Sequence, residues 1–468
     1  MDKEIVETRK LNKTKEVGLS KRRFAYLLLV FLFRLFLDIS YKYVISPEFD
    51  YLGFLNNQTP AFMVASWIIF IVFSFFAFSF FDNKRNQISK ELFSILYLLA
   101  FVPFTTLVSF GLFSPIYVFC NSLYWAFLMI FGHLLNSKKR KQKEQKKRIS
   151  GKNDNAITIF ALISVFVVMF ISARYANFRL NFNLFDVYDI RLEAREYNLP
   201  TILTYLYSFT KMTNAILITY YVSKKTKKGI IIGLLIFIVQ LFSFGIDGSK
   251  TTLFLALGGL AFGILPTIPQ RKLNYLFLVG MVLVTIAGLL LYTVFGNITL
   301  LSLISRRVLV DPQRISFQYF DFFTTHTPDF FRQSFLRYFG LSSPYEKPIA
   351  FVIAEFYEKE SFSANNGLIS DAMTNFGFAG LVLFPLIINI LLNIFDRVSI
   401  AVDSRIKIIV SVYFSVVLTN SFLTTSLLTH GLLVVLLLLY VISKNELALR
   451  TARQQVVKHV YRVRRYVA

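Results

Sequence analysis

The residue types suited to chemistry concentrate in one polar segment, residues 297–375, of a chain that is otherwise mostly apolar. A segment of about 80 residues usually carries function and does not merely link two helices. Its arginines have planar, multiply donating head groups that bind phosphate, while histidine and carboxylate side chains transfer protons. The segment therefore predicts a site that binds an anion and moves a proton. Its binding candidates are Arg306, Arg307, Arg314 and Asn375, and its catalytic candidates are His326, Glu355 and Asp371.

These candidates differ in how strongly the sequence supports them. Histidine titrates near neutral pH, which makes His326 a candidate base, but a lone histidine in a loop is more often hydrogen-bonded or solvated. Asp371 and Asn375 are four residues apart, so on a helix they share one face and point at the same cavity. The aromatic run 317–323 follows Arg314, and its rings offer apolar faces to sugar C–H groups and lipid tails. We expect a cationic site lined by rings.

Two further basic positions lie outside this segment. Arg191 and Arg195 are four residues apart within 176–199, so on a short helix their guanidinium groups share one face and can hold a diphosphate. Acidic residues among them leave an ion-pair network as the alternative. In the turn 245–250, glycines, a helix N-terminus and Lys250 converge, which favours an anion site. A simple hairpin turn between two helices is the alternative there.

The elements that must position these residues are membrane-spanning helices. Hydrophobic residues make up 55% of the chain, and apolar runs of about 20 residues, long enough to cross a bilayer, recur along it. We predict an all-α polytopic membrane protein of about 12 transmembrane helices, with the large extra-cytoplasmic loop 297–375 between helices 9 and 10. The predicted spans are 24–45, 61–81, 91–110, 116–135, 156–175, 200–222, 229–245, 251–266, 273–295, 376–395, 408–424 and 431–443.

The distribution of charge orients these spans. Connections rich in Lys and Arg, such as 138–152, alternate with connections that have almost none, so the positive-inside rule places both termini in the cytoplasm. The basic C-terminal tail is typical of a helix lying on anionic lipid. The predicted parts are a basic cytoplasmic N-terminus (1–23), a single transmembrane domain (24–443) with outer loops 176–199 and 297–375, and a basic cytoplasmic tail (444–468).

Composition excludes several classes of protein. The net charge of +24 is explained by the basic cytoplasmic connections, so the expected partner is the lipid bilayer and not nucleic acid. One cysteine and four histidines provide no disulfide framework and no cluster of metal ligands. We therefore predict neither a metal site nor a cofactor.

A few residues inside the predicted spans also carry information. Arg34 and Asp38 are four apart, which predicts a structural ion pair on one helix face. Lys211 lies near the middle of the sixth span and is expected to face a cavity as a binding residue. Gly259 and Gly263 form a GxxxG pair, which predicts close helix packing.

Several of these features together resemble the bacterial Wzy-type O-antigen and capsular polysaccharide polymerases. They are the twelve spans, the late outer loop, Arg191 after the fifth span, the turn ending at Lys250, and the stretches RRVLVDPQRISFQYFDFF (306–323) and NNGLISDAMTNFGFAG (365–380). The resemblance covers residues 156–395 with matching motifs, and the remainder in hydropathy alone. It implies a GT-C-like glycosyltransferase in the bacterial cytoplasmic membrane.

The resemblance also implies a reaction and a set of binding residues. The growing glycan moves from undecaprenyl diphosphate to a sugar hydroxyl of an incoming lipid-linked repeat unit, at the outer membrane face, and undecaprenyl diphosphate leaves. Arg191, Lys250, Arg306 and Arg314 would hold the diphosphate, although relatives often have arginine where Lys250 stands. The implied partners are undecaprenyl-diphosphate-linked glycans and the flippase and chain-length regulator of the same pathway.

Two alternatives remain open from the sequence. An O-antigen-ligase-like glycan transferase differs only in its acceptor. A lipid-linked oligosaccharide flippase or another transporter also suits twelve spans, but transporters usually show repeated halves with short outer connections, and the two halves of this chain differ in their loops.

Overall fold

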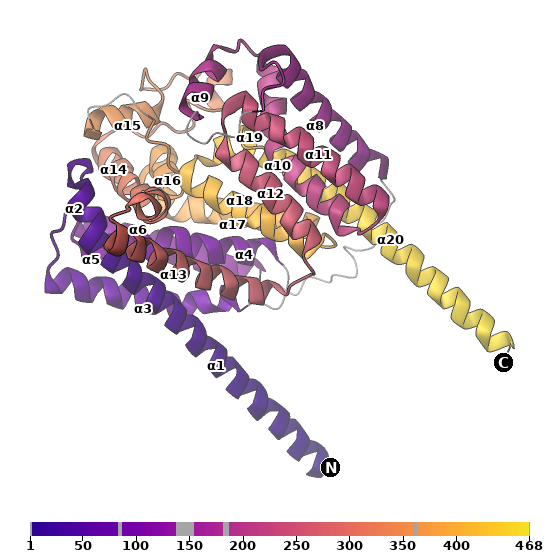
Figure 1. The fold of residues 1–468 in the computed structure, drawn as a ribbon. Helices are drawn as coiled ribbons and strands as arrows, with labels where there is room; N and C mark the ends of the chain where they lie inside the picture. The colour runs from indigo at the N-terminus through magenta and orange to yellow at the C-terminus, as the bar shows by residue number, and fades with distance from the viewer. Residues whose placement is uncertain (1, 83–86, 137–153, 181–186, 359–362, 468) are drawn as a thin grey trace.

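The computed structural model describes residues 2–82, 87–136, 154–180, 187–358 and 363–467. The predicted basic run 138–152 lies outside these residues. Within them every regular element is a helix, which confirms the all-α prediction, and the helices pack into one bundle (Figure 1).

Nine helices in the described part of the chain are long and apolar enough to cross a membrane, in agreement with nine of the twelve predicted spans. The other three predicted spans are also helices, but α12 and α18 are shorter and α10 contains more polar side chains. The nine segments are Gly18–Leu52, Pro60–Phe81, Ile88–Ser109, Pro115–Leu135, Asn155–Tyr175, Lys227–Asp247, Gln270–Phe295, Ile369–Val398 and Leu432–Ala452. The other three are α10 (Thr201–Ser223), α12 (Lys250–Ile264) and α18 (Ser404–Asn420).

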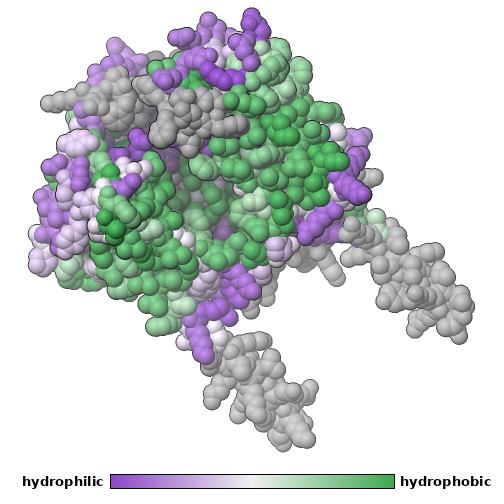
Figure 2. All heavy atoms as spheres, viewed as in Figure 1, coloured by the Kyte–Doolittle hydropathy of each residue, from purple (hydrophilic) through white to green (hydrophobic). Residues whose placement is uncertain are grey.

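The surface of the bundle matches this composition. Figure 2 shows a broad band of hydrophobic side chains with hydrophilic side chains gathered at both ends of the bundle. Leu162 and Phe166 on α8 (Asp154–Tyr175) are 63% and 67% exposed, an arrangement that suits lipid and not water.

Both chain termini project from one end of the bundle, which we call the terminal end, on α1 (Asp2–Ser40) and α20 (Leu432–Val467) (Figure 1). Contacts there join distant segments: Tyr275 donates to the carbonyl of Arg22 at 2.7 Å, and Asp82 pairs with Arg22 at 3.3 Å. At the opposite end, Tyr292 donates to Glu48 at 2.9 Å. The long polar segment after α13 (Gln270–Phe295) also lies at this opposite end, so it is on the side away from both termini (Figure 1).

Local sequence signals set several helix boundaries. Thr59 caps α3 (Pro60–Phe81) by accepting a hydrogen bond from the Phe62 amide at 3.3 Å, and Pro60 occupies the first turn, where its missing N–H costs nothing. Gly248 ends α11 (Lys227–Asp247) with a φ of 62°, a left-handed conformation that glycine adopts without strain. The turn 245–250 is therefore a tight link between two helices.

The predicted pair inside the first span is confirmed. Arg34 is fully buried and contacts Asp38 at 2.9 Å. It also donates to the Thr105 hydroxyl at 2.7 Å, on α5 (Val102–Ser109). Because a buried guanidinium needs several acceptors, these contacts tie α1 to the central helical segment Ile88–Ser109, whose apolar stretch is buried on all sides.

The GxxxG prediction is also confirmed. A Cβ atom on Gly259 would lie 2.8 Å from the carbonyl oxygen of Ala215, and one on Gly263 would lie 2.8 Å from Cβ of Val222. The two glycines thus allow the backbone of α12 to approach α10 closely.

The segment 297–375, predicted as the long connection between two spans, is mostly helical. Apolar side chains bury one face of four of its short helices, which stabilises helices that the polar composition of the segment obscured, whereas the short helix Leu336–Phe339 has no buried residue. The tenth span also begins earlier than predicted, at Ile369, with a break at Gly377, where φ is 55°. The elements are η4 (Leu301–Val310), α14 (Asp311–Thr325), η5 (Leu336–Phe339), α15 (Ile349–Glu358) and α16 (Ile369–Phe376).

Candidate functional site

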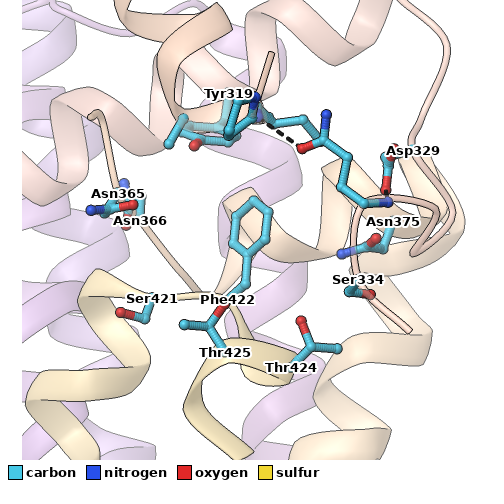
Figure 3. A pocket seen from close by; sticks show the side chains of 14 residues that line it. Tyr319, Asp329, Ser334, Asn365, Asn366, Asn375, Ser421, Phe422, Thr424 and Thr425 are labelled. Atoms are coloured by element: carbon cyan, nitrogen blue, oxygen red, sulfur yellow. Dashed lines mark hydrogen bonds between the residues drawn. The ribbon is translucent and has the colours of Figure 1, made fainter. Parts of the chain in front are cut away.

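A pocket of about 190 Å³ lies at the end of the bundle away from the termini, where the segment 297–375 meets the turn between α18 and α19 (Leu423–Leu428). Figure 3 shows the ring of Phe422 projecting between Asn365 and Asn366 on one side and Asn375 and Asp329 on the other. Most of the lining side chains are amides or hydroxyls. The lining comprises Tyr319, Asp329, Gln333, Ser334, Pro348, Ile349, Ala350, Asn365, Asn366, Asn375, Ser421, Phe422, Thr424 and Thr425.

Asn375 lines this pocket as a candidate binding residue, and its amide is held on both sides. Its oxygen accepts from the Phe331 amide at 2.8 Å, and its nitrogen donates to Asp371 at 2.6 Å. The predicted sharing of one helix face by Asp371 and Asn375 is thus confirmed.

Asp371 does not reach the pocket. Its side chain is completely buried, and its second oxygen accepts from the amide of Leu423, the first residue of α19. A carboxylate with both oxygens occupied inside the protein fixes neighbouring elements and cannot contact a bound hydroxyl. Its prediction as a catalytic base is corrected to a structural role that ties α16 to α19.

Asp329 is the carboxylate that lines the pocket, and the sequence analysis missed it. One of its oxygens accepts from the Ser343 hydroxyl at 2.6 Å and the other from the Gln333 amide at 2.8 Å. The Asp329 amide donates to the Thr374 carbonyl at 2.7 Å, which joins the loop after α14 to α16. The sequence signal was the Pro328-Asp329 pair, which is typical of a turn.

The other two catalytic candidates lie outside the pocket lining. His326 follows α14 and stacks on Phe322 with ring centroids 3.9 Å apart, while its Nδ1 lies 2.9 Å from the Phe322 carbonyl oxygen. Glu355 is 59% exposed on α15 and pairs with Lys347 at 2.6 Å. The structure brings neither of them together with Asn375.

Arg314 is neutralised within the protein. It contacts Asp311 at 3.1 Å and also pairs with Glu358, and its side chain is only 12% exposed. Its guanidinium also lies over the ring of Phe54. With two carboxylates around it, Arg314 is not a free cation for a diphosphate, so that prediction is corrected to a structural one.

Arg306 and Arg307 lie on η4 in a different setting. The Arg306 guanidinium lies 4.3 Å from the ring centroid of Phe49 and donates to the Ser302 hydroxyl at 3.0 Å. Partial burial lowers the pKa of Arg306, but an arginine stays charged at neutral pH. Arg307 is exposed. These two arginines remain available to an anion at the bundle surface.

The remaining basic candidates lie on a neighbouring part of the same end. Arg191 and Arg195 are exposed on α9 (Val187–Glu196), and Lys250 is exposed at the start of α12. Arg179 links these elements, since it donates to Glu193 on α9 at 2.6 Å and to the Gly245 carbonyl at 3.1 Å. The hydrogen bond from Arg179 lowers the pKa of Glu193.

Lys211 was expected to face a cavity, but it is not among the residues that line this pocket and lies in a cluster of polar groups. Its ammonium group pairs with Asp247 at 2.5 Å, and both side chains are about a fifth to a quarter exposed. Its charge reaches His430, in the turn before α20, and lowers the pKa of that histidine further than burial alone does. His430 Nε2 lies 3.0 Å from the hydroxyl of Ser421.

The sequence did not indicate Ser421 and its neighbours as pocket residues, because 408–424 was expected to be one continuous helix. Instead α18 ends at Asn420, Ser421 is extended with φ −152° and ψ 148°, and a short polar helix follows. The run of hydroxyl side chains at 419–426 was the available signal.

The chemistry of the pocket follows from its lining. Amide and hydroxyl groups offer both donors and acceptors, and the rings of Tyr319 and Phe422 offer apolar faces. None of the lining residues is a cation. Within the described ranges no three His, Cys, Asp or Glu side chains are placed to hold a metal ion. Comparison with protein-family descriptions, curated proteins and solved structures finds no match to this chain.

Proposed function

We propose that the protein polymerises undecaprenyl-diphosphate-linked oligosaccharide repeat units at the outer face of the bacterial cytoplasmic membrane. In this reaction the growing glycan is transferred to a sugar hydroxyl of an incoming repeat unit, and undecaprenyl diphosphate is released. The bond to the diphosphate supplies the free energy, so the reaction needs no nucleotide. The protein is then a glycosyltransferase of GT-C-like architecture.

The observation that carries this proposal is the polar, cation-free pocket at the end of the bundle away from the termini. A sugar ring presents hydroxyl groups that amides and hydroxyls bind, and C–H faces that pack on Phe422 and Tyr319. A pocket of about 190 Å³ is smaller than the roughly 300–1,000 Å³ sites of drug-sized ligands, so it suits one sugar unit.

A diphosphate would have to bind outside this pocket, at cations on the same end of the bundle. The candidates are Arg306 and Arg307 on η4, and Arg191, Arg195 and Lys250 beside the turn 245–250. The lipid-linked donor would then bind at two places: its sugar in the cation-free pocket, and its diphosphate at these cations.

We further infer that α10, α12 and α18 cross the membrane with the nine longer helices, which gives twelve spans. An even number of spans returns both termini to one side, in keeping with their projection from one end of the bundle in Figure 1. The positive-inside rule, applied to the basic connections in the sequence, supports the cytoplasm as that side. The pocket then faces outward, where lipid-linked repeat units are polymerised.

The test uses the purified full-length protein in lipid with a cell-derived pool of lipid-linked repeat units, and glycan length is followed on a gel. A ladder of lengths with release of undecaprenyl diphosphate is expected. Repeat units that cross the bilayer but stay single would instead identify a flippase. A single transfer onto a different acceptor would identify a ligase.

A further inference from the structure

We propose that Ser421 and His430 form the proton-accepting pair of the pocket. This inference rests on the proposed glycan transfer, because it assigns the group that deprotonates the acceptor hydroxyl. Ser421 lines the pocket, and its hydroxyl lies 3.0 Å from Nε2 of His430, within the range of a hydrogen bond.

The fold holds this pair in place on both sides. The backbone amide of His430 donates to the Thr425 carbonyl at 3.0 Å, and the His430 carbonyl accepts from Tyr413 on α18 at 3.2 Å. Gly431, at a φ of 75°, brings the turn close to Phe209 on α10. The histidine is therefore fixed between α18, α19 and α10.

The surrounding charges favour the neutral imidazole. Burial lowers the pKa of His430, and the ammonium group of Lys211 on α10 lowers it further. Lys211 is itself paired with Asp247 on α11, and the hydroxyl of Tyr413 on α18 also contacts the turn. A neutral ring with its proton on Nδ1 can accept at Nε2, so Ser421 can donate to it.

The proposed step moves two protons. The acceptor sugar hydroxyl binds to Ser421 Oγ, and as its oxygen attacks the anomeric carbon of the donor, its proton passes to Ser421 Oγ. The Ser421 proton passes at the same time to Nε2 of His430. The bond from the anomeric carbon to the phosphate oxygen breaks, and undecaprenyl diphosphate leaves with that electron pair.

Ser421 is thus the group that touches the substrate, and His430 acts through it as the base. The chain offers a matched control, because Ser79 and His133 form a similar contact with Nε2 at 3.1 Å on α3 and α6 (Pro115–Asn136), outside the pocket lining. His133→Gln therefore removes a serine–histidine contact without touching the pocket.

The experiment measures the rate of polymer formation against pH for the wild type and for His430→Gln, Ser421→Ala, Ser421→Thr and His133→Gln. The wild-type rate should fall on acidification below the ordinary histidine pKa of 6.5. His430→Gln and Ser421→Ala should each lower the rate by about 100-fold or more, the contribution of a positioned base. His430→Gln should also remove the acid limb. Ser421→Thr keeps the hydroxyl and should recover part of the rate that Ser421→Ala loses, while His133→Gln should resemble the wild type. A His430→Gln enzyme that keeps the acid limb would overturn the proposal.

A second readout separates this inference from the polymerase proposal. Diethyl pyrocarbonate modifies accessible histidines, and mass spectrometry reports the modification of His430 with and without the lipid-linked repeat units. If the wild type makes no polymer but the repeat units protect His430 and not His133, the pair still borders a glycan site and only the polymerase reaction is wrong. Equal modification of His430 in both samples would overturn the pair as part of the site.

Discussion

Replacing Arg314 by leucine removes the cation that neutralises Asp311 on α14 and Glu358 on α15. The side chains of Arg314 and Glu358 are each 12% exposed, so both charges are largely withdrawn from water. Removing one partner of a buried ion pair costs about 3–5 kcal/mol, because the other charge stays buried without its counter-charge. Since some water still reaches this pair, we expect about 3 kcal/mol, the lower end of that range.

Thermal unfolding of the purified protein in detergent measures this loss. Arg314→Leu should unfold at a clearly lower temperature than the wild type. A triple variant, Arg314→Leu with Asp311→Asn and Glu358→Gln, removes both unpaired charges and should recover most of the stability. It should also form polymer, because a structural arginine has no contact with the substrate.

Arg307→Leu is the matched control, because Arg307 is exposed on the same part of the chain and is a candidate for diphosphate binding. We expect it to leave the unfolding temperature unchanged and to lower the rate of polymer formation. The reasoning about Arg314 would be refuted by a triple variant that is as stable as the wild type but makes no polymer.

Four further outcomes are expected. Asp371→Ala leaves the Leu423 amide without its side-chain acceptor and takes one of two acceptors from the Asn375 side chain, and it should cost about 2–3 kcal/mol in thermal unfolding; an unchanged unfolding temperature would contradict its structural role. Gly259→Val should cost about 1–3 kcal/mol, because its Cβ would meet the Ala215 carbonyl, whereas a Cβ at Gly258 would have no neighbour within 4 Å, which makes Gly258→Val the control. Glu355→Ala should change the unfolding free energy by less than about 0.5 kcal/mol and leave polymer formation intact, since its ion pair is exposed; a hundredfold lower rate would restore it as a base. Arg179 lowers the pKa of Glu193, so the ion pair between these two residues is fully present above the ordinary pKa of 4.5 and is lost as the pH falls through the lowered pKa. Hydrogen exchange of the α9 backbone should therefore increase on acidification. Exchange that does not change with pH would show that this ion pair does not stabilise α9.

The sequence alone was sufficient for the parts of this protein that depend on neighbours along the chain. Hydropathy is a local property, so nine of the predicted spans are helices long and apolar enough to cross a membrane, and the other three are helices as well. Residues four apart on one helix also lie on the same face because of local geometry alone. The predicted contacts of Arg34 with Asp38 and of Asp371 with Asn375 are therefore both present.

The candidate site was predicted only in part, because its residues meet through packing. Asn375 lines the pocket, as expected of a binding residue. Lys211 does not line it, and Asp329, Ser421 and His430 were missed. Ser421 lies in a helix break that hydropathy does not distinguish from a continuing span.

Tertiary structure also decided which charged groups are available. Arg314 and Arg306 look equivalent in the sequence, but Glu358, 44 residues after Arg314, neutralises only the former. Asp371 appears in the sequence to be an available carboxylate. In the structure its second oxygen accepts a hydrogen bond from the amide of Leu423, 52 residues later in the chain. Spacing along a helix fixes which side chains share a face, whereas the packing of helices against one another determines which of those side chains keep a free charge or a free hydroxyl.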